Sequence, residues 1–294
     1  MSSKYKIVVD STTDLPANLA VEWGLTIIPY IFTLDGKDYY NHLDGRELSA
    51  KDFYNKQREG KTGSTTQVTA FRYKEAWEPI LREGFDILYL CLSSKVSKSY
   101  EQSLLAVHEL KEKYPERKII SVDTRSGSMG QGLLTYYAVR NQSGGNSLEE
   151  TATHLESIIP TMQHWIMVDD LHHLRRGGRV SGASAFVGTM LNIKPILALT
   201  DNVRIVPTHK VRGRNNALKY FLDRMTAQNM DPKGQIIAIV HTDMPELANQ
   251  LKEMIVEKFG PVEFIVNDVG PVIGMHTGPG TIATMFIGEG RPNG

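Results

Sequence analysis

The chain has 294 residues, of which 41% are hydrophobic and 22% are charged, values that are ordinary for a folded globular protein. Lysine plus arginine equals aspartate plus glutamate at 33 each, so the overall charge excludes general attraction to nucleic acid or to an anionic membrane. The single cysteine, Cys91, excludes an internal disulfide framework, and no apolar stretch approaches ~18 residues, so we expect a soluble cytoplasmic protein.

The first half of the chain alternates apolar strands with helical patterns. The strand candidates are apolar on both faces, which is typical of parallel strands covered by helices, and they lie at 7–9, 87–92 and 119–122. Helices are expected from Pro16 and at 71–81, 100–110 and 133–139. This alternation predicts right-handed βαβ units around a parallel sheet.

The second half has a different pattern, which predicts a mixed sheet. A strand at 164–168 precedes two runs, 194–200 and 203–206, that flank Asp201-Asn202 as in a hairpin. Further strands are expected at 236–240, 262–266 and 282–287, with helices at 217–225 and 245–259. The predicted fold class is α/β with an N-terminal parallel-sheet domain, 1–160, and a C-terminal mixed-sheet domain, 161–294.

Hydroxyl-rich segments follow three predicted strands and precede one predicted helix. They are DSTTD at 10–14, GSTTQVT at 63–69, SSKVSKS at 93–99 and DTRSGS at 123–128. Ligands of open α/β sheets bind beyond the carboxyl ends of the strands, where helix N-termini favour anions. Serine and threonine are also ordinary helix caps, so each cluster alone is explained by capping. Together they indicate an anion site at one edge of the sheet.

The segment GMHTGPGT at 274–281 is expected to form a turn between two strands. Its glycine spacing differs from the dinucleotide-binding fingerprint, and the chain has no P-loop. The histidines at 172, 173, 241 and 276 lack the spacing of a zinc site, so we expect no metal and no cofactor. Cys91 lies in an apolar strand, which favours a buried, unreactive thiol.

Two basic segments remain. The run containing Arg175, Arg176 and Arg179 is explained in part as a helix C-terminus capped by glycine. It also fits an exposed patch for an anionic partner or for transient contact with membrane headgroups. Arg212, which follows the hairpin, is either a solvated charge or a clamp for a carboxylate or phosphate.

The succession of these segments resembles the DegV family of fatty-acid-binding proteins over about 4–290. The resemblance is carried in order by VVDSTTDLP (8–16), STTQVT (64–69), LSSKVSKSYEQS (92–103), VDTRSGSMGQG (122–132), VDDLHHLRRGGRVSG (168–182), KPIL…KVRGR (194–214) and GPVIGMHTGPGT (270–281). It implies a long-chain fatty acid such as palmitate in an apolar tunnel between two α/β domains. It also implies that some members present the carboxylate to a separate kinase, which makes an acyl phosphate from ATP.

The resemblance implies that four residues bind the carboxylate: Thr65, Ser97, His276 and Arg212. Thr66 and Thr277 are secondary candidates. Lys98-Ser99 replaces the Gly-Thr that the family often has after the serine. Each buried CH₂ of the tail contributes ~0.8 kcal/mol, while the carboxylate needs hydrogen bonds to leave water.

The sequence therefore predicts a lipid-binding carrier that is not an enzyme in itself and binds no nucleic acid. The alternative is a phosphotransfer or hydrolytic enzyme that uses His276 or a strand-end serine. Sequence order assigns no base or metal ligand set to such an enzyme.

Overall fold

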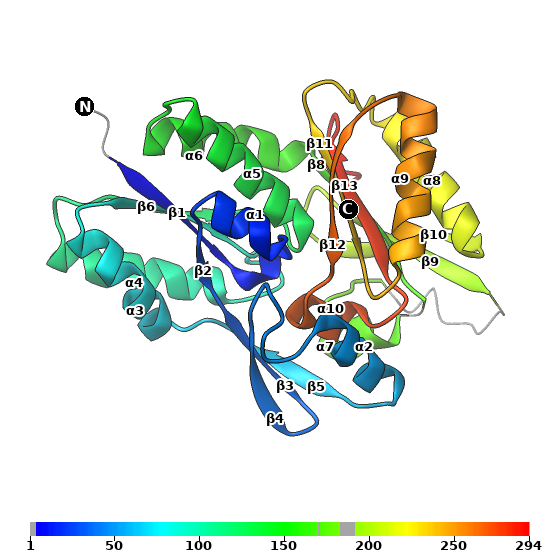
Figure 1. The fold of residues 1–294 in the computed structure, drawn as a ribbon, viewed down its shortest axis with the longest axis horizontal. Helices are drawn as coiled ribbons and strands as arrows, with labels where there is room; N and C mark the ends of the chain where they lie inside the picture. The colour runs from blue at the N-terminus through cyan, green and yellow to red at the C-terminus, as the bar shows by residue number, and fades with distance from the viewer. Residues whose placement is uncertain (1–3, 170, 183–191, 294) are drawn as a thin grey trace.

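A computed structural model describes residues 4–169, 171–182 and 192–293, which form three sheets with flanking helices (Figure 1). The N-terminal sheet has the order β2(Thr26–Ile28), β1(Tyr5–Asp10), β6(Asp86–Cys91), β7(Ile119–Asp123). Its strands all pair in parallel. The three predicted strands and their parallel pairing are confirmed, whereas the edge strand β2 was not predicted.

The helices of this half cover both faces of the parallel sheet. They are α1(Ala17–Glu22), α3(Ala70–Arg82), α4(Ser99–Lys113), α5(Met129–Ser143) and α6(Leu148–Ile158). α3 packs with α4 below the sheet in Figure 1, and α5 packs with α6 above it. α6 begins at a capping box in which Ser147 and Glu150 satisfy each other's backbone N–H groups. The predicted helices are confirmed, and α5 starts four residues earlier than expected.

A small antiparallel sheet that the sequence did not predict extends from the N-terminal half. It has the order β4(Lys37–Asn41), β3(Tyr30–Leu34), β5(Gly63–Thr66), and α2(Ala50–Arg58) lies beside it (Figure 1). The first four residues of GSTTQVT therefore form the strand β5, and the remaining three lead to the start of α3. Gly63 permits this pairing, because a Cβ there would lie 1.8 Å from the Thr33 carbonyl oxygen.

The C-terminal sheet has the order β10, β9, β8, β13, β11, β12. The strands are β8(Met162–Met167), β9(Ile193–Leu199), β10(Ile205–Arg212), β11(Ile236–His241), β12(Glu263–Asp268) and β13(Ile282–Ile287). β11 and β12 pair in parallel and the other neighbours pair antiparallel, which confirms the mixed sheet and the β9–β10 hairpin. α8(Arg214–Ala227) and α9(Pro245–Phe259) lie together at one side of this sheet (Figure 1).

The prediction of a simple turn at 274–281 was wrong, because α10(Pro271–Thr277) includes its first four residues. Pro271 has the fixed φ that suits the first position of a helix, and Gly270 precedes it in an extended conformation. Val272 and Met275, three residues apart, are both buried. The helix ends at Gly278, whose φ of 77° favours glycine, and a short turn then leads to β13.

The two large sheets share one hydrophobic core. Side chains of β1, β6, α5, β11 and β13 belong to a single buried cluster, including Val9, Leu90, Met129, Val240 and Met285. The chain passes from one half to the other at the short helix Ile159–Thr161. The domain limits of 1–160 and 161–294 remain a prediction. Within the described ranges no helix is long and apolar enough to cross a membrane.

Candidate ligand-binding site

Side chains from both halves of the chain surround a cavity. The enclosed volume is about 120 Å³, below the ~300–1,000 Å³ that is usual for ligand sites, and the surrounding space between atoms, part of it open to solvent, is about 810 Å³. The apolar lining residues are Leu92, Val96, Ile166, Leu174, Leu199, Ile205, Val272, Ile273 and Met285. The polar lining residues are Thr65, Ser93, Ser126, Ser128, His164, Arg179, His276 and Thr277. The walls suit a mainly apolar ligand with one polar end.

Thr65 and His276 meet at the wall of this cavity. Thr65 lies on β5 and His276 on the last turn of α10, and the Thr65 Oγ1 atom is 2.9 Å from His276 Nε2. Burial, followed by the charges of Arg179 and Arg176, lowers the pKa of His276 to about 4. The ring is therefore neutral near pH 7 and has one N–H group.

The tautomer of His276 follows from its surroundings. The Nδ1 atom is buried and has no hydrogen-bond partner among the described residues. A buried N–H without an acceptor is rarer than a buried lone pair, so the proton belongs on Nε2, facing Thr65. His276 then donates to Thr65 Oγ1, which leaves the threonine proton for another acceptor.

A close approach of α7(His172–Gly177) fixes the ring of His276. A Cβ at Gly177 would lie 2.3 Å from His276 Nδ1, so only glycine permits this contact. α7 ends at Gly178 in the left-handed conformation, which confirms the helix C-terminus expected there. Arg175 and Arg176 lie exposed on this helix, whereas Arg179 follows it and lines the cavity.

Ser97 lies beside the cavity in the loop that precedes α4. Its neighbour Val96 lines the cavity, and the Val96 carbonyl accepts a hydrogen bond of 3.2 Å from Arg179 Nε. The Ser97 Oγ atom is 3.3 Å from the Tyr30 hydroxyl and 3.1 Å from Ser99 Oγ. The sequence-predicted Thr65, His276 and Thr277 thus line one cavity, with Ser97 next to its wall.

Arg212 lies elsewhere in the structure. It is the last residue of β10 and lines a separate pocket with Lys194 and Arg214. Arg212 is not among the residues that line the cavity of Thr65 and His276, so its assignment to the carboxylate stays a prediction. Thr66 is exposed and follows Thr65 on a strand, where successive side chains point to opposite faces.

Three of the four hydroxyl clusters contribute to the cavity, and DSTTD does not. Thr12 donates from Oγ1 to Gln131 Oε1 over 2.9 Å, and its backbone N–H donates to the buried carboxylate of Asp10. The DSTTD segment therefore makes hydrogen bonds within the protein interior and does not line this cavity. The sequence indicated Ser93, Ser126 and Ser128 only as members of the hydroxyl-rich segments at 93–99 and 123–128, and not as individual site residues.

His164 and Arg179 were not predicted to line a ligand site. His164 is buried on β8, where burial lowers its pKa to about 3, and its ring lies against the Cα of Gly130. No local sequence signal marks it, because its position depends on how α5 packs against β8.

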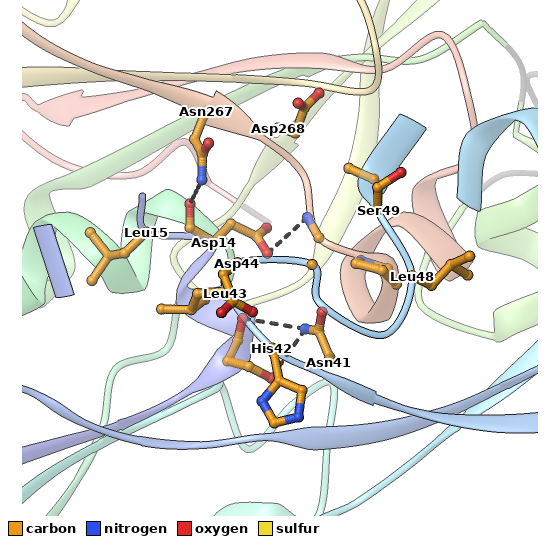
Figure 2. A pocket seen from close by; sticks show the side chains of 15 residues that line it. Asp14, Leu15, Asn41, His42, Leu43, Asp44, Leu48, Ser49, Asn267 and Asp268 are labelled. Carbon is orange, nitrogen blue, oxygen red and sulfur yellow. Dashed lines mark hydrogen bonds between the residues drawn. The ribbon is translucent and has the colours of Figure 1, made fainter. Parts of the chain in front are cut away.

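A second, polar pocket lies where the two halves meet at the carboxyl end of β1 (Figure 2). Asp14 is its central residue: Oδ1 accepts from Gly270 N over 2.9 Å and Oδ2 accepts from Ser128 Oγ over 2.6 Å. Asn267 Nδ2 donates to the Asp14 carbonyl over 2.8 Å. Because the protein itself satisfies both carboxylate oxygens, Asp14 connects the two halves. In the ranges that the structure covers, no group of three His, Cys, Asp or Glu residues could hold a metal ion.

A family model described as an uncharacterised protein of the DegV family matches residues 4–289. The chain belongs to the DegV family. A DegV domain-containing protein of Clostridium perfringens is 40% identical over 286 residues, which are 97% of this chain and 98% of the relative. A DegV domain-containing protein of Lactococcus lactis is 34% identical over 96% of this chain and 97% of its own length.

Solved DegV structures share the fold over nearly the whole chain. A DegV family protein from Thermus thermophilus, described by its fatty acid binding, has a TM-score of 0.86 and 30% identity, over 97% of this chain and 99% of that one. DegV from Bacillus subtilis, described as a fatty acid binding protein, has a TM-score of 0.84 and 28% identity, over 98% and 100% of the two chains. These comparisons confirm the family and the two-part α/β architecture.

Proposed function

We propose that this DegV family protein binds a long-chain fatty acid, such as palmitate, in the cavity between its two halves. The observation that carries the proposal is the contact between Thr65 and His276 at the wall of a mainly apolar cavity. The carboxylate binds beside Thr65 and Ser97, and the acyl chain lies between the apolar walls, which move apart to hold it because the enclosed volume is about 120 Å³. The fatty-acid-binding relatives from Thermus thermophilus and Bacillus subtilis support the same ligand class.

The energetics of this ligand fit the two kinds of lining. A tail of ~14–18 carbons gains ~0.8 kcal/mol for each CH₂ removed from water, so the tail supplies most of the affinity. The carboxylate loses its hydration and needs donors in return. Neutral His276 donates to Thr65, and Thr65 donates to the carboxylate. The guanidinium of Arg179, which lines the same cavity, provides the nearby positive charge.

The protein acts in this proposal as a cytoplasmic carrier that presents the carboxylate to a separate kinase. The exposed Arg175 and Arg176, with Arg179, form the surface proposed for that partner or for transient contact with a membrane. Arg212, Thr66 and Thr277 remain secondary candidates for contact with the carboxylate.

The enzymatic alternative would be a phosphotransfer or hydrolytic enzyme that uses His276 or a strand-end serine as a covalent carrier. A histidine whose pKa lies at about 4 is a weak base near pH 7, and this weak basicity favours the carrier. Incubation of the chain alone with ATP and palmitate separates the two functions. Acyl-phosphate formation without a partner would establish the enzyme.

The binding proposal is tested by removing both hydroxyls, Thr65→Ala with Ser97→Ala, and measuring bound lipid by native mass spectrometry. Each hydrogen bond to a charged group contributes about 1.5–3 kcal/mol, so we expect palmitate affinity to fall by at least about 10-fold. The matched control is Ser64→Ala with Ser157→Ala, which removes two exposed hydroxyls outside the cavity. A double variant that still carried the wild-type lipid load would refute the assignment.

A further inference from the structure

Arg179, which follows the C-terminus of α7, donates hydrogen bonds to backbone carbonyls of both halves of the chain. Its Nε–H donates to the Val96 carbonyl over 3.2 Å, in the loop that carries Ser97. Its Nη1–H donates to the carbonyl of Gly177, the last residue of α7. Arginines near a helix C-terminus often bond the last carbonyls, so the contact with Gly177 alone is explained by capping. The contact with Val96 is not, because it joins positions 83 residues apart.

The helices α7 and α10 lie side by side, and each places a histidine against a glycine of the other (Figure 1). A Cβ at Gly177 of α7 would be 2.3 Å from His276 Nδ1. In the opposite direction, a Cβ at Gly278, which ends α10, would be 2.3 Å from His173 Cδ2 on α7. Because the backbone of α7 touches the imidazole of His276, a displacement of the end of α7 displaces His276 as well.

Together these contacts form a closed chain around the proposed carboxylate site. His276 Nε2 is 2.9 Å from Thr65 Oγ1, which joins α10 to β5. The segment after Thr65 bonds the start of α4, because Val68 N donates to Ser99 Oγ over 3.0 Å, directly after the Ser97 loop. The guanidinium then connects the Ser97 loop back to α7. The chain of contacts thus crosses between the two halves twice, once at His276 and once at the guanidinium.

We infer that Arg179 is a positioning residue that holds the Ser97 loop and His276 in place around one carboxylate, through its forked guanidinium and not only through its charge. The inference rests on the proposed function, because it requires a carboxylate at this site. A guanidinium has five N–H donors in fixed directions, so two can bond the Val96 and Gly177 carbonyls while the others stay available. An ammonium group presents the same charge at one point and does not reproduce these two directed bonds.

The charge of Arg179 acts on the same histidine. Burial, followed by the charges of Arg179 and Arg176, lowers the pKa of His276 to about 4. Arg179→Lys keeps a positive charge at this position, whereas Arg179→Gln removes it. Neither substitution keeps the guanidinium fork. A comparison of the two variants therefore separates the charge of Arg179 from the geometry of its hydrogen bonds.

The test measures the affinity of wild type, Arg179→Lys and Arg179→Gln for palmitate and for 1-hexadecanol, which has the same tail without the carboxylate. We expect Arg179→Lys to weaken palmitate by about 3- to 10-fold, because the Ser97 loop loses its bond to α7, and Arg179→Gln at least as much. Hexadecanol affinity should change by less than about 2-fold. The matched control is Arg117→Lys, which removes another guanidinium bond to a backbone carbonyl, that of Gly84, outside the cavity.

A double-mutant cycle with Ser97→Ala shows whether the fork acts through Ser97. If it does, Arg179→Lys weakens palmitate less once Ser97 is replaced, by a factor of at least about 2. Equal losses in both backgrounds, or equal weakening of palmitate and hexadecanol, would overturn the inference. So would a wild-type palmitate affinity of Arg179→Lys; if Arg179→Gln or Ser97→Ala then binds weakly, the proposed function stands without the positioning role. A wild-type affinity of Thr65→Ala with Ser97→Ala refutes the head-group assignment itself.

Discussion

Replacement of Gly274 by alanine tests how α10, and with it His276, is positioned. Gly274 lies in the middle of α10, where helix propensity alone predicts that alanine stabilises by about 0.8–1 kcal/mol. The tertiary structure predicts the opposite sign. A Cβ at this position would lie 2.3 Å from the Tyr54 hydroxyl oxygen and 2.9 Å from Tyr54 Cζ.

The magnitude follows from what Tyr54 loses when it is displaced. Tyr54 is fully buried on α2, and its hydroxyl donates to the Val269 carbonyl over 2.6 Å. Overpacking costs about 1–3 kcal/mol and an unsatisfied buried carbonyl about 1–3 kcal/mol. After subtraction of the propensity gain, Gly274→Ala should lower the free energy of unfolding by about 1–5 kcal/mol.

Urea or guanidinium denaturation of four proteins gives the measurement: wild type, Gly274→Ala, Tyr54→Phe and the double variant. Phenylalanine removes the nearest obstructing atom, so alanine at 274 should cost less in that background, with a coupling of at least about 1 kcal/mol. Gly290→Ala is the control, because a Cβ there meets no atom within 4 Å. We expect its stability within about 0.5 kcal/mol of wild type.

Additive losses in the cycle would show that Tyr54 and Gly274 do not compete for the same space. A stabilised Gly274→Ala would refute the reasoning entirely, because propensity would then outweigh the packing of α2 against α10.

Two further predictions concern ionisable groups. Burial raises the pKa of Asp14 to about 7 from ~3.9 in the unfolded chain, so its contribution to stability is complete below pH ~4 and is lost as pH rises through 7. Asp14→Asn should remove up to about 4 kcal/mol of this decrease in the free energy of unfolding, measured by denaturation at several pH values. The buried histidines His164 and His276 raise stability as pH rises, but they do so equally in wild type and variant. If the free energy of unfolding changed with pH in parallel in the two proteins, the assignment to Asp14 would be wrong. Burial also keeps the pKa of the Cys91 thiol well above its ordinary value, so a thiol reagent should label it only on unfolding; rapid labelling of the native protein would disprove this.

Local sequence patterns predicted most of the regular structure. The apolar runs that became β1, β6 and β7 are hydrophobic on both faces, which is typical of strands in a parallel sheet covered by helices. The β9–β10 hairpin and the long helix α9 were predicted for equally local reasons, namely a turn dipeptide and a helical start at proline. The buried state of Cys91 followed from the strand that contains it.

The sequence by itself thus determined the α/β class, the order of most elements and the motifs that identify the family. The tertiary structure alone decided that β5 joins a small sheet, that Pro271–Thr277 is a helix and that Arg212 lies apart from Thr65. It also brought His276 to Thr65 across 211 positions. The physical reason is that short segments have no decisive periodicity of their own. Their conformation depends on distant contacts, such as Tyr54 against Gly274 and Gly177 against His276, which no local pattern encodes.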